Sequence, residues 1–171
     1  MTNDLNHLPI VETGFWPNEA AAQRMAQAMA EPAMLDNAFI ALHGDLGAGK
    51  TTWVRHLLRA LGASGPIKSP TYAVVEAYTL PEIKVWHFDF YRFADPREWE
   101  DAGFRDIFAG PGLKLAEWPE QAQAWLPTPD LMLSLGLVDV QARHVRVQAN
   151  TPCGAALLQR ARSVLPAESH P

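Results

Sequence analysis

The sequence predicts an α/β fold in which a mixed β-sheet is covered by helices on both faces. Three observations support this prediction. Short apolar runs typical of strands alternate with segments whose apolar residues recur at helical spacing. Two pairs of neighbouring strand-like runs are separated by short turns, which indicates hairpins and a sheet that is not purely parallel. One strand-like run leads into a glycine-rich loop and then a helical segment.

The expected helices begin at recognisable capping residues. Asn18 is a suitable N-cap for an Ala-rich helix, and Asp95 followed by Pro96 and Glu98 forms a strong helix start. Gly103 should interrupt the helix that follows Asp95. The expected helices cover residues 19–30, 51–61, a short stretch from residue 96, 119–125 and 153–165.

The expected strands are short. Those at 72–79 and 83–91 should pair as a hairpin, and those at 130–138 and 143–149 should pair as a second one. The other expected strands are residues 9–16, at an edge of the sheet, 38–42 and 113–116.

The composition suits one globular unit. A chain of 171 residues with 48% hydrophobic residues can bury one substantial core. We therefore expect a single domain over residues 1–171, with its core at about 10–150 and a C-terminal helix and loose tail at 151–171.

Charge and cysteine content argue against several function classes. The net charge of −5, from 14 Lys and Arg against 19 Asp and Glu, argues against a broadly basic nucleic-acid-binding surface. Cys153 is the only cysteine, which excludes an intramolecular disulfide and a cysteine-based zinc cluster and suits a reducing cytosol. The N-terminal residues lack a basic segment followed by an apolar one, and no apolar run is long enough to span a membrane. We therefore expect a cytoplasmic protein without a membrane segment.

The glycine-rich loop at residues 44–51, GDLGAGKT, fits the Walker A pattern G-x-x-x-x-G-K-[ST]. Its glycines let backbone N–H groups surround a phosphate, Lys50 can reach the β- and γ-phosphates, and the Thr51 hydroxyl can ligate Mg²⁺. An accidental match is the alternative, but the strand before the loop and the helix after it aim a helix N-terminus at the phosphates. The sequence therefore predicts a P-loop NTPase-like protein whose nucleotide contacts come from Asp45, Leu46, Gly47, Ala48, Gly49, Lys50, Thr51 and Thr52.

Two carboxylates are candidates for the rest of the site. Mg²⁺ prefers hard oxygen ligands, and Thr51 alone does not hold it. Asp89 ends an apolar run in the manner of a Walker B aspartate, or it only caps the next turn. Glu117 ends the next apolar run, where it either completes the metal shell through water, orients the attacking water, or is simply solvated. The candidate metal ligands are Thr51, Asp89 and Glu117.

Residues 69–72, SPTY, lie where P-loop switch proteins keep a segment that senses the γ-phosphate. Thr71 could supply a hydroxyl to Mg²⁺ or phosphate, or the segment is an ordinary turn. Arg92 is a cation that either lies near phosphates or forms a surface ion pair. His43 and His87 are expected to be packed on strands rather than catalytic. The candidate catalytic residues are Lys50, Thr71, Asp89 and Glu117.

With these motifs in order, the chain resembles the TsaE family, also called YjeE, of bacterial ATPases in tRNA threonylcarbamoyladenosine biosynthesis. The resemblance runs from about residue 18 to residue 146 and includes the segment 94–106. Phe90 stands where the family commonly has Leu, and Trp86 where it often has Tyr. Four motifs carry the resemblance: GDLGAGKTT at 44–52, SPTY at 69–72, HFDFYR at 87–92 and EW at 117–118.

The resemblance implies ATP and Mg²⁺ as cofactors, with Thr51 and Glu117 at the metal and Asp89 as the Walker B acid. It implies that residues 69–72 form a nucleotide-sensitive switch and that Trp118 packs beside the nucleotide. No sharp motif covers the adenine-binding surface, for which the candidates are Asn18, Glu19 and Arg143.

The resemblance also implies a cellular role. The protein would be a small cytoplasmic ATPase that supports threonylcarbamoyladenosine modification of tRNA at position 37. It would dock on a complex of TsaB and TsaD, reset that complex between turnovers and contact tRNA only indirectly. Intrinsic hydrolysis should be slow, because Arg92 is the only obvious cation near the predicted site and a partner would need to complete it.

Two other functions are compatible with the loop. A small-molecule kinase would transfer the γ-phosphate to a metabolite, but no basic lid insertion is visible in the sequence. A nucleotide-dependent binding switch of the GTPase kind would carry an N-K-x-D guanine signature and a D-x-x-G after the switch-like segment, and neither is present.

Overall fold

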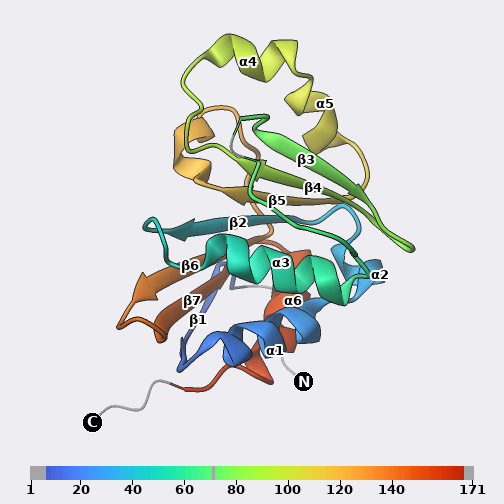
Figure 1. Ribbon diagram of the computed structural model, residues 1–171. Coiled ribbons are helices and arrows are strands. Elements are labelled where there is room, and N and C mark those ends of the chain that lie inside the picture. The colour runs from blue at the N-terminus through green and yellow to red at the C-terminus, as the bar shows by residue number, and fades with distance from the viewer. Residues whose placement is uncertain (1–6, 71, 168–171) are drawn as a thin grey trace.

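The computed structural model describes residues 7–70 and 72–167, so Thr71 and the last residues of the expected tail lie outside the described part. Within that part, seven strands form one sheet in the order β1-β7-β6-β2-β5-β4-β3 (Figure 1). The central strands β6, β2, β5 and β4 are parallel, whereas β1, β7 and β3 pair with their neighbours in antiparallel fashion. The predicted mixed sheet is therefore confirmed. The strands are β1 (Ile10–Trp16), β2 (Phe39–Gly44), β3 (Val75–Thr79), β4 (Lys84–Asp89), β5 (Leu113–Glu117), β6 (Leu131–Leu137) and β7 (Arg143–Ala149).

The helices begin largely where the caps predict. The side chain of Asn18 accepts a hydrogen bond from the backbone N–H of Ala21 at 3.2 Å, and that of Asp95 accepts one from Arg97 at 2.9 Å. Gly103, with φ of 71°, separates two short helices as expected. No helix in the described ranges is both long and apolar enough to cross a membrane. The helices are α1 (Glu19–Met29), α2 (Pro32–Leu35), α3 (Lys50–Ala60), α4 (Pro96–Asp101), α5 (Phe104–Ala109), the 3₁₀ turn η2 (Pro119–Ala122) and α6 (Pro152–Arg162).

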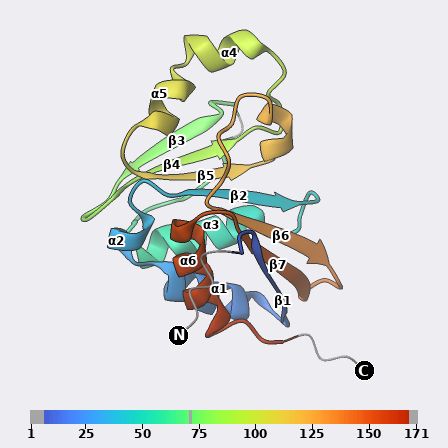
Figure 2. The same ribbon diagram turned by 180° about the vertical axis from the view of Figure 1, so that it is seen from behind.

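The two faces of the sheet have separate cores. Successive side chains of a strand point to opposite faces, so Ile40 and Leu42 of β2 join the core formed with α1, α3 and α6. Phe39 and Ala41 join the second core, which α4 and α5 cover (Figures 1 and 2). Helices therefore lie on both faces, as predicted.

The second core is a cluster of aromatic rings. Phe88 of β4 packs against Phe90 and Phe108 with ring centroids 5.3 and 4.9 Å apart. Trp99 of α4 stacks on Phe108 of α5 at 5.6 Å, and both Phe88 and Trp99 are almost completely buried. Burial of rings of this size dominates core energetics, so the cluster fixes the ends of β4 and β5, which carry Asp89 and Glu117.

Three expected elements differ in length. The strand expected from residue 72 begins at Val75, because Val74 has φ of 65° and cannot continue an extended strand. The strand expected to reach residue 91 ends at Asp89, whose carboxylate accepts from the backbone N–H of Tyr91 and starts a turn. The helix expected at 119–125 is a 3₁₀ turn over Pro119–Ala122, and the short helix α2 was not expected.

The N-cap of α6 ties that helix to the sheet. The Thr151 hydroxyl accepts from the backbone N–H of Gly154 at 3.1 Å and donates to Oδ1 of Asp130 at 2.7 Å. Oδ2 of Asp130 accepts from the backbone N–H of Phe39, the first residue of β2, at 2.8 Å. The contact thus joins α6 to the strand that leads into the glycine-rich loop.

We expect Thr151→Ala to lower the free energy of unfolding by about 1–2 kcal/mol, because it removes a helix cap and one partner of Asp130. Urea denaturation measures the change. Thr128→Ala, in an exposed loop position, is the control and should stay within about 0.5 kcal/mol. Equal stability of the two variants would contradict this account.

Candidate functional site

The glycine-rich loop connects the end of β2 to the start of α3, in the strand–loop–helix order that the sequence predicts. Gly49, the N-cap of α3, has φ of 105°, a left-handed conformation that favours glycine. A Cβ at Gly44 would lie 2.8 Å from the backbone oxygen of Leu135, so this position also requires glycine. No side chain caps the first turn of α3. Its free N–H groups and the helix dipole favour an anion at this end.

Lys50 is the first residue of α3, and its side chain is buried. Its Nζ donates a hydrogen bond to the backbone oxygen of Gly44 and lies 3.6 Å from the centroid of a Trp118 ring. Burial lowers the pKa of Lys50, and the nearby carboxylate of Glu117 opposes that shift. The ammonium group therefore lies inside the loop, where a phosphate on the loop would contact it.

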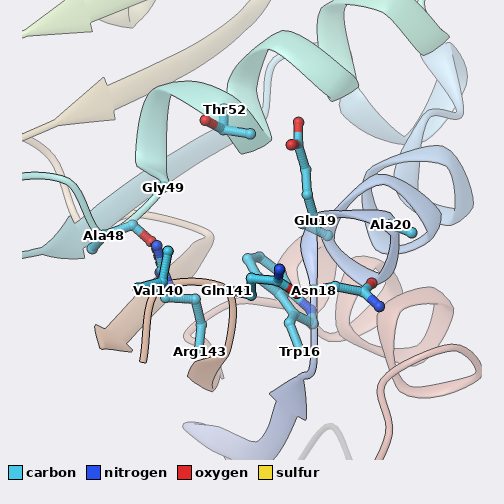
Figure 3. Close-up of a pocket in the computed structure, with 11 residues that line it drawn as sticks. Trp16, Asn18, Glu19, Ala20, Ala48, Gly49, Thr52, Val140, Gln141 and Arg143 are labelled. Atoms are coloured by element: carbon cyan, nitrogen blue, oxygen red, sulfur yellow. Dashed lines mark hydrogen bonds between the residues drawn. The ribbon is translucent and has the colours of Figure 1, made fainter. Parts of the chain in front are cut away.

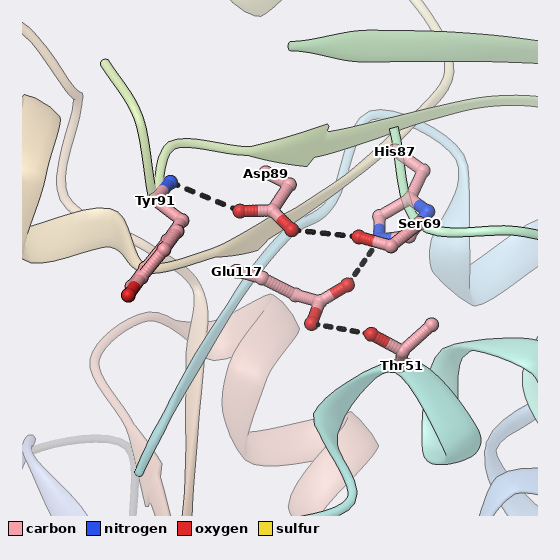
Figure 4. A network of polar contacts seen from close by, with 6 residues as sticks. All are labelled: Thr51, Ser69, His87, Asp89, Tyr91 and Glu117. Atoms are coloured by element: carbon pink, nitrogen blue, oxygen red, sulfur yellow. Dashed lines mark hydrogen bonds and ion pairs between the residues drawn. The ribbon is translucent and has the colours of Figure 1, made fainter. Parts of the chain in front are cut away.

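Glu117 ends β5 and is 2% exposed. Its Oε1 accepts from the hydroxyl of Thr51 at 2.7 Å, and its Oε2 lies 2.6 Å from Nε2 of His87 (Figure 4). The carboxylate thus joins the first turn of α3 to the neighbouring strand β4.

Asp89 ends β4 and pairs in register with Glu117 of β5. Its Oδ2 accepts from the Ser69 hydroxyl at 2.6 Å, and its Oδ1 accepts from the backbone N–H of Tyr91 at 2.9 Å (Figure 4). The carboxyl ends of parallel strands meet at one edge of a sheet, where ligands of α/β proteins bind. The two carboxylates predicted from the sequence are therefore side by side, and Asp89 also caps a turn.

A cavity of about 480 Å³ contains most of the predicted site. Arg92, exposed and 5.3 Å from the Tyr72 ring centroid, also lines it. Asp45 lies in the loop but not on the cavity wall, and Thr71 is outside the described residues. The predicted residues on its wall are Leu46, Gly47, Ala48, Gly49, Lys50, Thr51, Thr52, Asp89 and Glu117.

A second cavity, of about 460 Å³, lies on the other side of the loop (Figure 3). Asn18, Glu19 and Arg143, the three candidates for an adenine surface, all line it. Nε of Arg143 donates to the backbone oxygen of Ala48 at 2.7 Å, so β7 supports the loop directly. The two cavities share the wall formed by Ala48, Gly49 and Thr52.

Sequence reasoning missed some residues of the second cavity and the contact made by His87. Trp16 and Gln141 line the second cavity, and no local pattern marks them. His87 contacts Glu117, although the sequence predicted only a packed residue. The signal available was its position two residues before Asp89, because residues two apart on a strand share a face.

The parallel strands, the loop and the helix behind it define a P-loop NTPase-like α/β protein. The family model described as threonylcarbamoyl adenosine biosynthesis protein TsaE matches residues 16–145. The chain belongs to this family, which functions in threonylcarbamoyladenosine biosynthesis.

Curated relatives carry the same family name. The tRNA threonylcarbamoyladenosine biosynthesis protein TsaE of Haemophilus influenzae is 43% identical over 117 residues, which cover 68% of this chain and 73% of that protein. The protein of the same name from Bacillus subtilis is 34% identical over 134 residues, which cover 78% and 81%. The crystal structure of Bacillus subtilis YdiB has a TM-score of 0.72 at 23% identity and covers 92% of this chain and 97% of that one. That likeness supports the fold.

Gly49→Ala tests whether the loop conformation depends on glycine. No atom from a more distant part of the chain lies within 4 Å of the position that a Cβ would take at Gly49, so the cost comes from its φ of 105°. We expect the free energy of unfolding to fall by about 1–2 kcal/mol. Gly136→Ala on β6, which meets only an ordinary contact 3.6 Å away, is the control and should cost less than about 0.5 kcal/mol. Denaturant unfolding compares them, and an unaffected Gly49→Ala variant would contradict the assigned conformation.

Proposed function

We propose that the protein binds and hydrolyses ATP with Mg²⁺ and thereby supports threonylcarbamoyladenosine modification of tRNA at position 37. The proposal places it in the cytoplasm, acting on a complex of TsaB and TsaD. The observation that carries it is the contact between the Thr51 hydroxyl and the Glu117 carboxylate at the start of the loop helix, with Asp89 in register beside it.

Phosphate binding rests on the loop. The N–H groups of the first turn of α3 and the ammonium of Lys50 provide positive charge in a small volume. Lys50 is buried, and charge interactions are stronger away from water. A triphosphate in the first cavity would exchange the Gly44 carbonyl for phosphate oxygens as the partner of the ammonium.

The oxygen atoms around Thr51 fit Mg²⁺. A hydroxyl and two carboxylates, from Thr51, Glu117 and Asp89, are hard ligands of the kind this ion prefers. In the described ranges, no three His, Cys, Asp or Glu side chains converge as a dedicated metal cage. The ion would therefore be shared with phosphate oxygens and water, which is usual for Mg²⁺ at nucleotide sites. When bound, it would neutralise charge on the phosphates.

The two carboxylates have different surroundings. Asp89 is held by the Ser69 hydroxyl and a turn N–H, whereas Glu117 contacts Thr51 at the start of the helix. We assign Asp89 to the metal through its Walker B position, and Glu117 to the metal or to the attacking water. Arg92 is the exposed cation on the cavity wall. Phosphoryl transfer depends on cations that stabilise the transition state. Since the described residues of the cavity offer only Arg92 in addition to Lys50, hydrolysis by the isolated protein should be slow.

The second cavity suits the nucleoside part of ATP. It adjoins the loop at Gly49 and Thr52, and its wall combines the indole of Trp16 with the polar groups of Gln141 and Arg143 (Figure 3). Nucleotide sites typically combine apolar and aromatic walls with a few polar groups. Calorimetry with ATP and GTP tests the base preference, and a clear preference for GTP would favour a GTPase-like switch instead.

Lys50→Ala and Glu117→Ala should separate binding from hydrolysis. Loss of the Lys50 ammonium should abolish ATP binding, because that charge contacts the phosphates. Glu117→Ala should leave ATP bound in the absence of Mg²⁺ but reduce turnover by at least about tenfold, because it removes a group that we assign to the metal or to the attacking water. Calorimetry and phosphate release measure the two effects, and unchanged turnover would remove Glu117 from the mechanism.

Reconstitution tests the cellular role. Threonylcarbamoyl transfer to tRNA by TsaB and TsaD should proceed through multiple turnovers only when this protein and ATP are both present. The Lys50→Ala variant should fail to support it. Formation of a phosphorylated metabolite in stoichiometric yield, when candidate acceptors are added, would instead identify a small-molecule kinase.

A further inference from the structure

His87 is the most completely buried ionisable side chain at the site, with an exposed fraction of 0%. It lies on β4 two residues before Asp89 and on the same face of the sheet. Its Nε2 atom is 2.6 Å from Oε2 of Glu117. An ionised carboxylate accepts hydrogen bonds at both oxygens and donates none, so Nε2 of His87 is the donor in the tautomer that pairs with it.

The other ring nitrogen of His87, Nδ1, shows what a histidine contributes at this position. Nδ1 is buried and has no hydrogen-bond partner among the described residues. A buried polar atom without a partner costs free energy. An apolar side chain of similar size would fill the same space without that cost. The contribution specific to histidine is therefore the hydrogen bond from Nε2 to Glu117.

That hydrogen bond is one of two that hold the carboxylate of Glu117 in its orientation. Each oxygen of Glu117 has a different partner, Thr51 on one side and His87 on the other (Figure 4). A Thr51 hydroxyl that held a metal ion through its oxygen could still donate its proton to Oε1, so His87 would be the second partner of the carboxylate and the one that lies on the sheet. Asp89 is oriented separately, by Ser69 and by the turn at Tyr91.

We propose that His87 is a positioning residue that holds the Glu117 carboxylate in the orientation needed for Mg²⁺-dependent ATP hydrolysis. This inference rests on the function proposed above. Hydrogen bonds from outer groups of this kind orient carboxylate ligands, and their loss typically costs about 10–100-fold in metal affinity or activity.

The test compares His87→Leu, which removes the donor, with His87→Gln, whose side-chain amide can donate from nearly the same position. Glu117→Gln and the double variant His87→Leu/Glu117→Gln complete a cycle. His43→Leu is the matched control. His43 also contacts a glutamate, Glu120, at 3.3 Å, but it lines a cavity on the opposite face of the sheet. Circular dichroism and thermal melting check that each variant folds.

Two measurements are made on each variant. The first is ATP affinity by calorimetry with and without Mg²⁺, and the second is the single-turnover rate of hydrolysis. His87→Leu should keep its metal-free affinity within about threefold, lose most of the affinity gained from Mg²⁺, and hydrolyse ATP about 10–100-fold more slowly. His87→Gln should recover most of both losses, and His43→Leu should match the wild-type protein.

The cycle separates positioning from a general packing role. Addition of His87→Leu to Glu117→Gln should change neither measurement further, because residues that act as a unit are not additive. Multiplied effects in the double variant, or a His87→Leu variant that keeps both the Mg²⁺ gain and the rate, would overturn the proposal. Failure of His87→Gln to recover either loss would do the same.

Measurements on the wild-type protein distinguish a failure of the proposed function from a failure of the role proposed for His87. A wild-type protein that binds ATP with a Mg²⁺-dependent gain but never hydrolyses it would refute the ATPase, and the Mg²⁺ gain alone would then decide the role of His87. If the wild-type protein hydrolyses ATP but gains no ATP affinity from Mg²⁺, the single-turnover rates of the variants would decide the role of His87. A wild-type protein that does neither would refute both.

Discussion

The carboxylate of Glu117 connects the parts of the site. It lies at the end of β5, accepts from Thr51 of the loop helix and contacts His87 of β4. In the same strand register it lies opposite Leu42 of β2 and Asp89 of β4. A one-residue shift of β5 would turn this side chain toward the aromatic core on the other face. The register of the parallel strands, the start of α3 and the position of both carboxylates therefore depend on one another.

The loop is held from two directions. On one side Lys50 and Thr51 contact groups at the ends of the central strands, and on the other Arg143 of β7 donates to the backbone oxygen of Ala48. Strand β7 lies between β1 and β6 in the sheet. Arg143 of β7 also lines the second cavity, together with residues of α1. Both cavities thus share one backbone segment, and a ligand long enough to fill them would contact β4, β5, β7 and α1 together.

Local patterns predicted the fold class and the residues next to the loop. Lys50, Asp89 and Glu117 each stand at the end or start of an element, so the apolar runs and caps that mark those elements also place the side chains. Contacts between distant segments could not be predicted this way. Arg143 lies 96 residues from Gly47, to which its guanidinium donates at 3.3 Å, and only the strand order brings them together. The contact between His87 and Glu117 likewise depends on the pairing of β4 with β5, which a local sequence pattern does not give.

Burial of these polar groups separates the site from the rest of the core. Among the described residues, the buried polar or charged side chains are Lys50, His87, Lys114 and Glu117, and three of the four belong to this site. Buried charges cost several kcal/mol each unless they are paired and hydrogen-bonded, and apolar replacements are often more stable. The core on the opposite face shows that this chain can cover the same strands mainly with apolar side chains. Stability therefore does not explain the polar side chains beneath the loop, and their arrangement agrees with the proposed binding of a charged ligand.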